Sequence, residues 1–240
     1  MTGVAGDVLV AHQPAYLPWP GYFTRLSGTQ RLVVLDHVQF SERGWQNRNT
    51  VADRRGAPVR LTVPVQRSHG QRLADTRIAG TDWAARHWRT LSQCYGKAPY
   101  WPQWTEQLAA IYHTRWVYLA DLNDALTRLL LEGLEVNVEI IRSSTLDLTT
   151  SKTPMLLQLC EITGCRVLRV GSGALAYLDH NALCEAGIEL EVATYKPVGP
   201  LEPRGAGSLL DTLLRHGPAS RELVQAGAHI MTWLPEGATA

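Results

Sequence analysis

Residues 8–36 have the sequence VLVAHQPAYLPWPGYFTRLSGTQRLVVLD. Its two short apolar runs, residues 8–11 and 32–36, are typical of buried strands. A short helix is expected between them over residues 20–27, because it begins with a proline, whose missing backbone N–H costs nothing at that position. The order strand, loop, helix, strand predicts the start of a parallel α/β sheet.

The second half of the chain continues this alternation. Strands are expected at residues 138–142, 166–170 and 188–195, and helices at residues 152–163, 181–186, 208–215 and 218–225. Glycine follows the first two of these helices, as it commonly does at helix ends. The pattern predicts a Rossmann-like layered α/β fold with a mainly parallel sheet and helices on both faces.

Two segments interrupt the alternation. A β-hairpin is expected from residues 49–52 and 59–65, because β-branched residues flank a turn that contains Gly56. After an expected exposed loop over residues 66–80, apolar residues at helical spacing predict helices at 82–94, 104–112 and 119–134. We interpret residues 1–240 as one α/β domain, with a helical insertion at about residues 82–136 that covers one face of the sheet.

Composition argues against several classes of function. The 23 basic and 22 acidic residues give a net charge of +1, so the protein as a whole has no strong electrostatic attraction to nucleic acid or an anionic membrane. No apolar run reaches the roughly 20 residues of a membrane span, and the N-terminus lacks the pattern of a secretion signal, so a cytoplasmic protein is expected. The four cysteines have no zinc-type spacing, and no metal site is expected.

Polar residues follow several of the expected strands. Ligands of parallel α/β sheets bind at the carboxyl ends of the strands. His12 is the candidate for proton transfer there, and Asp36 is the candidate to orient His12 or a substrate hydroxyl or amine. The alternatives are a structural histidine that bonds a loop carbonyl and an aspartate that caps a turn.

The run from Trp45 to Asn49 concentrates planar hydrogen-bonding groups. Its amide and guanidinium groups are suited to carboxylates, phosphates, amides or sugar hydroxyls, while Trp45 offers a stacking face. The alternative is a side-chain network that joins the hairpin to the first strand. The full set of candidate substrate-binding residues is Gln13, Tyr16, Trp19, Tyr22, Gln39, Trp45, Gln46, Asn47, Arg48, Asn49, Ser151, Lys152, Gly171, Gly173 and Tyr177.

The motifs give no clear indication of a cofactor. The loop after the first strand can be compared with the HIGH-type loop of nucleotidyltransferases and class I synthetases, but Gly21-Tyr22 replaces its Gly-His pair. No GxxxxGK[ST] phosphate loop is present. Gly171-Ser172-Gly173 has the composition of a turn that cradles an anion, although such turns are common. The cofactor is therefore left unspecified.

Three motifs carry a resemblance to a known family. They are HQPAYLPWPGYF at residues 12–23, LDHVQFSERGWQNRN at 35–49 and LTVPV at 61–65. With weaker similarity at residues 143–144, 151–157, 171–179 and 208–214, the chain resembles the WbqC-like family over nearly its whole length. It departs from the family at residues 171–178, where GSGALAYL stands in place of GPxxKDYL and lacks the Lys-Asp pair. If that lysine binds substrate, the departure implies a different or less anionic substrate, unless Lys152 substitutes.

The resemblance implies a role in small-molecule biosynthesis, of O-antigen and related surface sugars or of specialised metabolites. It points to an enzyme of acyl or aminoacyl transfer, with amide formation on an amine and with an acyl or aminoacyl carrier protein as a candidate partner. On chemical grounds His12 suits the base, and Gln13, Asn47 and the amides of residues 171–173 suit the oxyanion. The alternatives are an ATP-dependent adenylating or nucleotidyl-transferring enzyme and a non-catalytic partner that binds a sugar nucleotide or a carrier.

Overall fold

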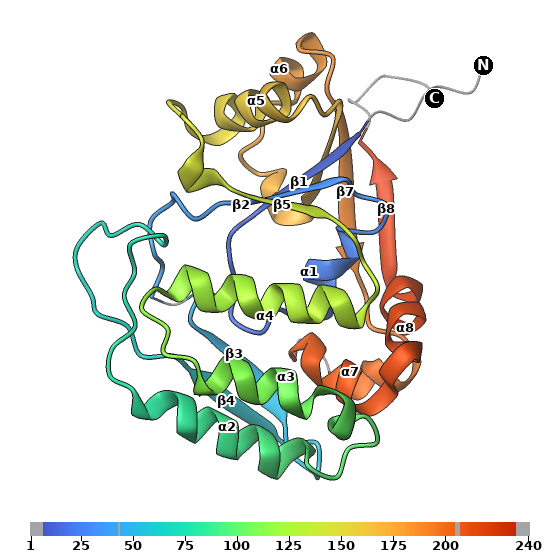
Figure 1. The fold of residues 1–240 in the computed structure, drawn as a ribbon. Coiled ribbons are helices and arrows are strands. Elements are labelled where there is room, and N and C mark those ends of the chain that lie inside the picture. Colours follow the sequence, from blue (N-terminus) through green and yellow to red (C-terminus); the bar gives the residue numbers. More distant parts are fainter. Residues whose placement is uncertain (1–6, 43, 205–206, 234–240) are drawn as a thin grey trace.

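The computed structural model describes residues 7–42, 44–204 and 207–233. Its main sheet has six strands in the order β5-β2-β1-β6-β7-β8 (Figure 1). The strands are β1 (Val8–His12), β2 (Arg31–Val34), β5 (Glu139–Arg142), β6 (Val167–Gly171), β7 (Glu189–Tyr195) and β8 (Ala228–Thr232). All neighbouring pairs are parallel except β7 and β8. The predicted α/β class with a mainly parallel sheet is confirmed.

Strand β8 is an addition to the predicted elements. It runs antiparallel to β7 at the edge of the sheet, with Met231 opposite Val192. Its residues are mostly exposed, so it lacks both the continuous apolar run and the apolar-polar alternation by which strands are found in a sequence.

Alternate residues of the central strands face two separate cores. Leu9, Val33 and Leu168 face the core that includes α5 (Lys152–Thr163) and α6 (His180–Glu185). Val10, Leu32 and Val34 face the other and larger core. Burial on both faces explains why β1 and β2 are uninterrupted apolar runs.

The larger core contains the helical insertion and the hairpin. The hairpin β3 (Arg48–Ala52) and β4 (Pro58–Thr62) is a sheet of its own. Helix α4 (Leu119–Gly133) lies beside the main sheet, whereas α2 (Asp82–Tyr95) and α3 (Trp101–His113) pack on each other farther out (Figure 1). Only the last helix of the expected insertion therefore covers the sheet directly.

The remaining elements of the described chain are three helices and four short 3-10 turns. They are α1 (Pro20–Thr24), α7 (Leu209–His216), α8 (Ser220–Ala226) and the short 3-10 turns η1 (Ser143–Thr145), η2 (Ser172–Ala174), η3 (Gly199–Arg204) and η4 (Gly217–Ala219). Within the described ranges, no helix is long and apolar enough to cross a membrane.

Residues 66–80 form a loop, as predicted, but the loop is not simply exposed. Leu73 and Thr76 are fully buried, and the N–H of Leu73 donates to the carbonyl of Val38 at 2.9 Å. The expectation of an exposed loop is wrong at these positions, because the segment packs back onto the residues after β2.

The strand order places a crevice beside β1. The chain moves from β1 to β2 and β5 on one side, then returns to β6 and β7 on the other. At such a reversal the connections diverge from the carboxyl ends of the two central strands and leave room for a ligand. In this protein the crevice lies between the ends of β1 and β6.

Candidate functional site

A cavity of about 310 Å³ occupies the crevice. It is named the switch-point cavity, because the strand order reverses beside it. Six predicted site residues line it together: His12, Gln13, Lys152, Gly171, Gly173 and Tyr177. They come from the end of β1, the start of α5 and the turn after β6. The cavity is also lined by Ala11, Arg25, Leu35, Met155, Leu156, Arg169, Val170 and Ala174.

His12, the last residue of β1, has a defined hydrogen-bonding state. Its Nδ1 lies 2.7 Å from the carbonyl oxygen of Gln13, which can only accept, so Nδ1–H is the donor. The edge of the ring packs against Tyr22, with the ring centroids 4.6 Å apart. The proton on Nδ1 leaves Nε2 of the neutral imidazole with its lone pair available.

The surroundings of His12 keep the imidazole neutral. Burial lowers the pKa of His12 to about 4, the positive charge of Arg25 acts in the same direction, and the hydrogen bond to Gln13 opposes them. At pH 7 the ring is therefore an acceptor, as a general base must be.

Gln13 is held in one orientation by its neighbour Gln46. The Nε2 of Gln46 donates to Oε1 of Gln13 at 2.8 Å. Gln46 is itself fixed, because its Oε1 accepts from the backbone N–H of Ser41 at 2.6 Å and its carbonyl accepts from Asn123 at 2.8 Å. With its oxygen occupied, the carboxamide of Gln13 offers its NH₂ group as a donor.

Arg25 is a site residue that sequence reasoning missed. It is the C-cap of α1, and its guanidinium lies against Gly171, where a Cβ would be 2.5 Å from Nη2. Arg25 has no ion pair or side-chain hydrogen bond within the described chain. Burial lowers its pKa, which the phenol groups of Tyr22 and Tyr177 partly oppose.

Lys152 contributes a second cation to the cavity. It is the first residue of α5 and has a φ of +54°, a left-handed conformation that costs a non-glycine residue about 1–2 kcal/mol. Ser151 before it is the N-cap, and its side chain makes no capping hydrogen bond. The positive end of the helix dipole therefore adds to the charge of Lys152.

Asp36 occupies a structural position instead. It is fully buried, and Oδ1 accepts from the backbone N–H of Ser144 at 2.8 Å and from the hydroxyl of Ser143 at 3.2 Å. Its Oδ2 accepts from the hydroxyl of Ser144 at 2.8 Å. These bonds join the ends of β2 and β5, and within the described residues Asp36 makes no hydrogen bond to His12, which it was expected to orient.

The three amide residues of the polar run after Trp45 form the side-chain network that was the alternative interpretation, whereas the buried Nε of Arg48 has no hydrogen-bond partner among the described residues. The buried Asn47 donates to the carbonyl of Val63 at 2.9 Å, and the buried Asn49 donates to the carbonyl of Leu17 at 2.5 Å. The hairpin is thereby joined to the loop after β1. None of Gln46, Asn47, Arg48 and Asn49 lines the switch-point cavity.

The other predicted site residues lie outside the cavity as well. The hydroxyl of Tyr16 is buried between His87, at 2.8 Å, and the hydroxyl of Tyr112, at 2.7 Å. Trp19 packs edge-on against Tyr195. Gln39 is exposed in an isolated bridge with Arg72.

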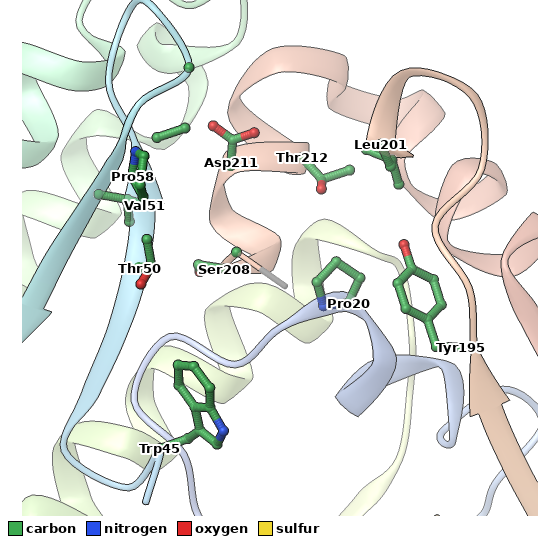
Figure 2. A pocket seen from close by; sticks show the side chains of 13 residues that line it. Pro20, Trp45, Thr50, Val51, Pro58, Tyr195, Leu201, Ser208, Asp211 and Thr212 are labelled. Atoms are coloured by element: carbon green, nitrogen blue, oxygen red, sulfur yellow. The ribbon is translucent and has the colours of Figure 1, made fainter. Parts of the chain in front are cut away.

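Trp45 is exposed but lines a different hollow. Figure 2 shows this second pocket, of about 340 Å³, where Trp45 and Tyr195 stand on either side of Pro20. It is bounded by the hairpin, the start of α7 and the end of β7. The indole is therefore not available to stack on a ligand beside His12.

Among residues 7–42, 44–204 and 207–233, no group of three or more histidine, cysteine, aspartate or glutamate side chains is placed to hold a metal ion. The cavity lining contains no carboxylate, while it contains Arg25, Lys152 and Arg169. Its chemistry is that of hydrogen-bond donors and cations around one neutral imidazole.

Comparison with known proteins agrees with the motif resemblance. The model of the WbqC-like protein family matches residues 13–222. The chain belongs to the WbqC-like family. It is also 32% identical over 219 residues to a Mycobacterium tuberculosis (strain ATCC 25618 / H37Rv) protein named "Uncharacterized protein Rv1507c", an alignment that covers 85% of this chain and 92% of the relative. No solved structure matches the chain.

Proposed function

We propose that this WbqC-like protein is an enzyme of small-molecule biosynthesis that transfers an acyl or aminoacyl group onto an amine. The observation that carries the proposal is the neutral imidazole of His12, which lines the switch-point cavity and keeps the lone pair of Nε2 available. Amide formation needs a base that can remove a proton from the attacking nitrogen. The motif resemblance supports an amino sugar or a specialised-metabolite intermediate as the amine.

The reaction would proceed by addition and elimination. The lone pair of the uncharged amine forms a C–N bond to the acyl carbon, and the carbonyl π electrons move to oxygen. The nitrogen becomes strongly acidic as this bond forms, and Nε2 of His12 takes its proton. When the tetrahedral intermediate collapses, the bond to the leaving group breaks, and that group departs with the electron pair and the proton from His12.

Gln13 is the group best placed to stabilise the oxyanion. Its NH₂ group is an oriented donor, because Gln46 occupies its oxygen. Losing one such donor typically reduces the rate about 10²–10³-fold. Asn47, the other expected side-chain donor, donates to the carbonyl of Val63 and does not line the cavity.

The proposal can be tested by mass spectrometry of product formation. The full chain is incubated with a nucleotide-linked amino sugar and an acyl thioester of coenzyme A or of a carrier protein, with and without ATP and magnesium. We expect acylated amine in the absence of ATP, and a loss of about 10²–10⁴-fold in His12→Gln. His69→Gln, a substitution of an exposed histidine outside the cavity, is the matched control.

Other outcomes would favour the alternative functions. Formation of AMP or of a nucleotidylated product that depends on ATP would favour an adenylating or nucleotidyl-transferring enzyme. Tight binding of the sugar nucleotide or carrier without turnover would favour a non-catalytic partner. Acyl transfer at an undiminished rate in His12→Gln would show that the base assigned here is wrong.

A further inference from the structure

We propose that the switch-point cavity binds the dianionic phosphate group of a phosphorylated ligand, between Arg25 and Lys152. The inference deepens the proposed function and rests on it for the chemistry that follows binding, because it names the class of substrate or acyl donor that the same cavity accepts. Its basis is a positive charge in the cavity without any counter-charge from the described chain.

Two other sheltered arginines, Arg169 and Arg215, are paired with carboxylates. Arg169, which also lines the cavity, lies 2.6 Å from Glu191 and donates to the carbonyls of Arg25 and Ser27. Arg215 lies 2.8 Å from Asp211. A sheltered guanidinium is costly unless its charge and donors are satisfied. Arg25 lacks such partners and faces a cavity, so an external anion is the group that would satisfy it. Within the described chain Arg48 also has no ion pair and a buried Nε without a hydrogen-bond partner, but it does not line this cavity.

The backbone of Arg25 is held in place by the fold. Arg169 binds the backbone carbonyl of Arg25 at 2.9 Å and so fixes the end of α1. Gly171 allows the guanidinium to approach, because any Cβ there would lie 2.5 Å from Nη2. The half-buried guanidinium therefore stands on a fixed backbone, in contact with Gly171 at the wall of the cavity.

The cavity as a whole carries a positive charge. Arg25 and Lys152 are both without an ion pair within the described chain, and no carboxylate lines the cavity. Two positive charges match a phosphate dianion better than a single carboxylate. The contrast with the overall charge of +1 shows that this is a local arrangement rather than a basic protein.

The cavity also provides space and additional hydrogen-bond donors beside the two cations. Nothing lies within 4 Å of a Cβ built on Gly173, so the backbone of this turn borders open cavity. The NH₂ group of Gln13 and the N-terminus of α5 add partial positive charge. The phosphate site thus adjoins His12, so a ligand held there would bring its reacting group to Nε2.

The experiment is calorimetric titration of the full chain with pyrophosphate, inorganic phosphate and acetate. We expect pyrophosphate to bind more tightly than phosphate, and acetate to bind weakest. Arg25→Met and Lys152→Met should each weaken pyrophosphate binding about tenfold or more. The matched controls Arg86→Met and Lys97→Met remove exposed charges outside the cavity and should leave binding unchanged.

Several results would overturn the inference. They are absence of pyrophosphate binding at millimolar concentrations, equal weakening by the control variants, and tighter binding of acetate than of phosphate, which would indicate a carboxylate site. Lys152 is exposed, so its substitution tests the site even if Arg25→Met fails to fold. Because the titration contains neither amine nor acyl donor, phosphate binding and acyl transfer can fail independently of each other.

Discussion

A Cβ built on Gly171 would lie 2.5 Å from Nη2 of Arg25, so the last residue of β6 and the C-cap of α1 are in direct contact. The two residues come from opposite sides of the switch point. Their contact brings a cation from the first connection of the sheet to the end of a strand in its second half. The absence of a side chain at residue 171 is therefore a condition for the charge in the cavity.

This contact predicts a specific energetic coupling. Gly171→Ala should destabilise the fold by less than about 1 kcal/mol, because the added methyl group displaces only the flexible end of the Arg25 side chain. In an Arg25→Ala background the same substitution should cost almost nothing. Urea unfolding of the two single variants and the double variant measures the coupling.

Gly173→Ala is the matched control for that cycle. Nothing lies within 4 Å of a Cβ at residue 173, so this substitution should not couple to Arg25. Equal and additive effects of Gly171→Ala in both backgrounds would show that the guanidinium does not occupy the position described.

The pKa of His12 reports the charge of Arg25. Arg25→Met should raise this pKa above about 4, but not to the usual 6.5, because burial is the larger cause of its depression. Pyrophosphate should raise it in the unsubstituted protein for the same electrostatic reason. NMR titration of the imidazole carbons measures both shifts, and an unchanged pKa in Arg25→Met would contradict the assigned contact.

The parallel sheet was predictable because its signals are local. Strands β1 and β2 are continuous apolar runs, and α5 and α6 end next to glycines, so the alternation of elements could be read along the chain. The sheet order could not be read in this way, since it depends on which strands pair. Strand β8 was missed because its exposed edge position leaves no apolar pattern.

The lining of the cavity was predictable mainly where a residue follows a strand, although Lys152 at the start of α5 was also named from the sequence. His12, Gln13 and Gly171 were found by that rule. Arg25 follows a short helix and has the sequence context of an ordinary surface charge, so only the approach of Gly171 reveals it. Conversely, the polar run at residues 46–49 satisfies buried backbone groups, and its composition alone could not separate that role from ligand binding.

The acid stability of the protein should depend on His87. This buried side chain lies 2.8 Å from the hydroxyl of Tyr16, and burial lowers its pKa to about 4. As the pH falls from 6.5 to 4, His87 becomes protonated in the unfolded chain but stays neutral in the native protein. The free energy of unfolding therefore decreases. The loss attributable to this residue is about 3 kcal/mol.

Urea unfolding at several pH values tests this expectation. His12 has a similarly lowered pKa and contributes in the same range, so the comparison is between the unsubstituted protein and His87→Gln. The variant should be less stable at neutral pH, because it disturbs the bond to Tyr16, but its stability should fall less steeply toward pH 4. An identical slope would contradict the assignment.

Gln46 should support both the fold and the donor in the cavity. Gln46→Leu leaves the N–H of Ser41 without its acceptor and releases the carboxamide of Gln13, at a cost of about 1–3 kcal/mol. Gln93→Leu, at an exposed position of α2, is the matched control and should be nearly neutral. Thermal unfolding gives the cost. If acyl transfer is observed, Gln46→Leu should also reduce kcat, whereas a purely structural Gln46 would leave it unchanged.

The pH dependence of catalysis gives the sharpest test of His12 as the base. Its unprotonated form must act, and the pKa of His12 in the free protein is about 4. Expressed per concentration of uncharged amine, which is the form that attacks, kcat/KM should therefore stay constant on acidification from pH 7 and fall only near pH 4. A bound phosphate would neutralise Arg25 and raise the pKa of His12, so kcat, which reports the complex, should fall at a higher pH than kcat/KM. In Arg25→Met the acidic limb of the kcat/KM profile should shift to higher pH, toward the acidic limb of the kcat profile. A limb of kcat/KM at the ordinary histidine value of about 6.5 in the unsubstituted protein would mean that the base is not the His12 imidazole described here.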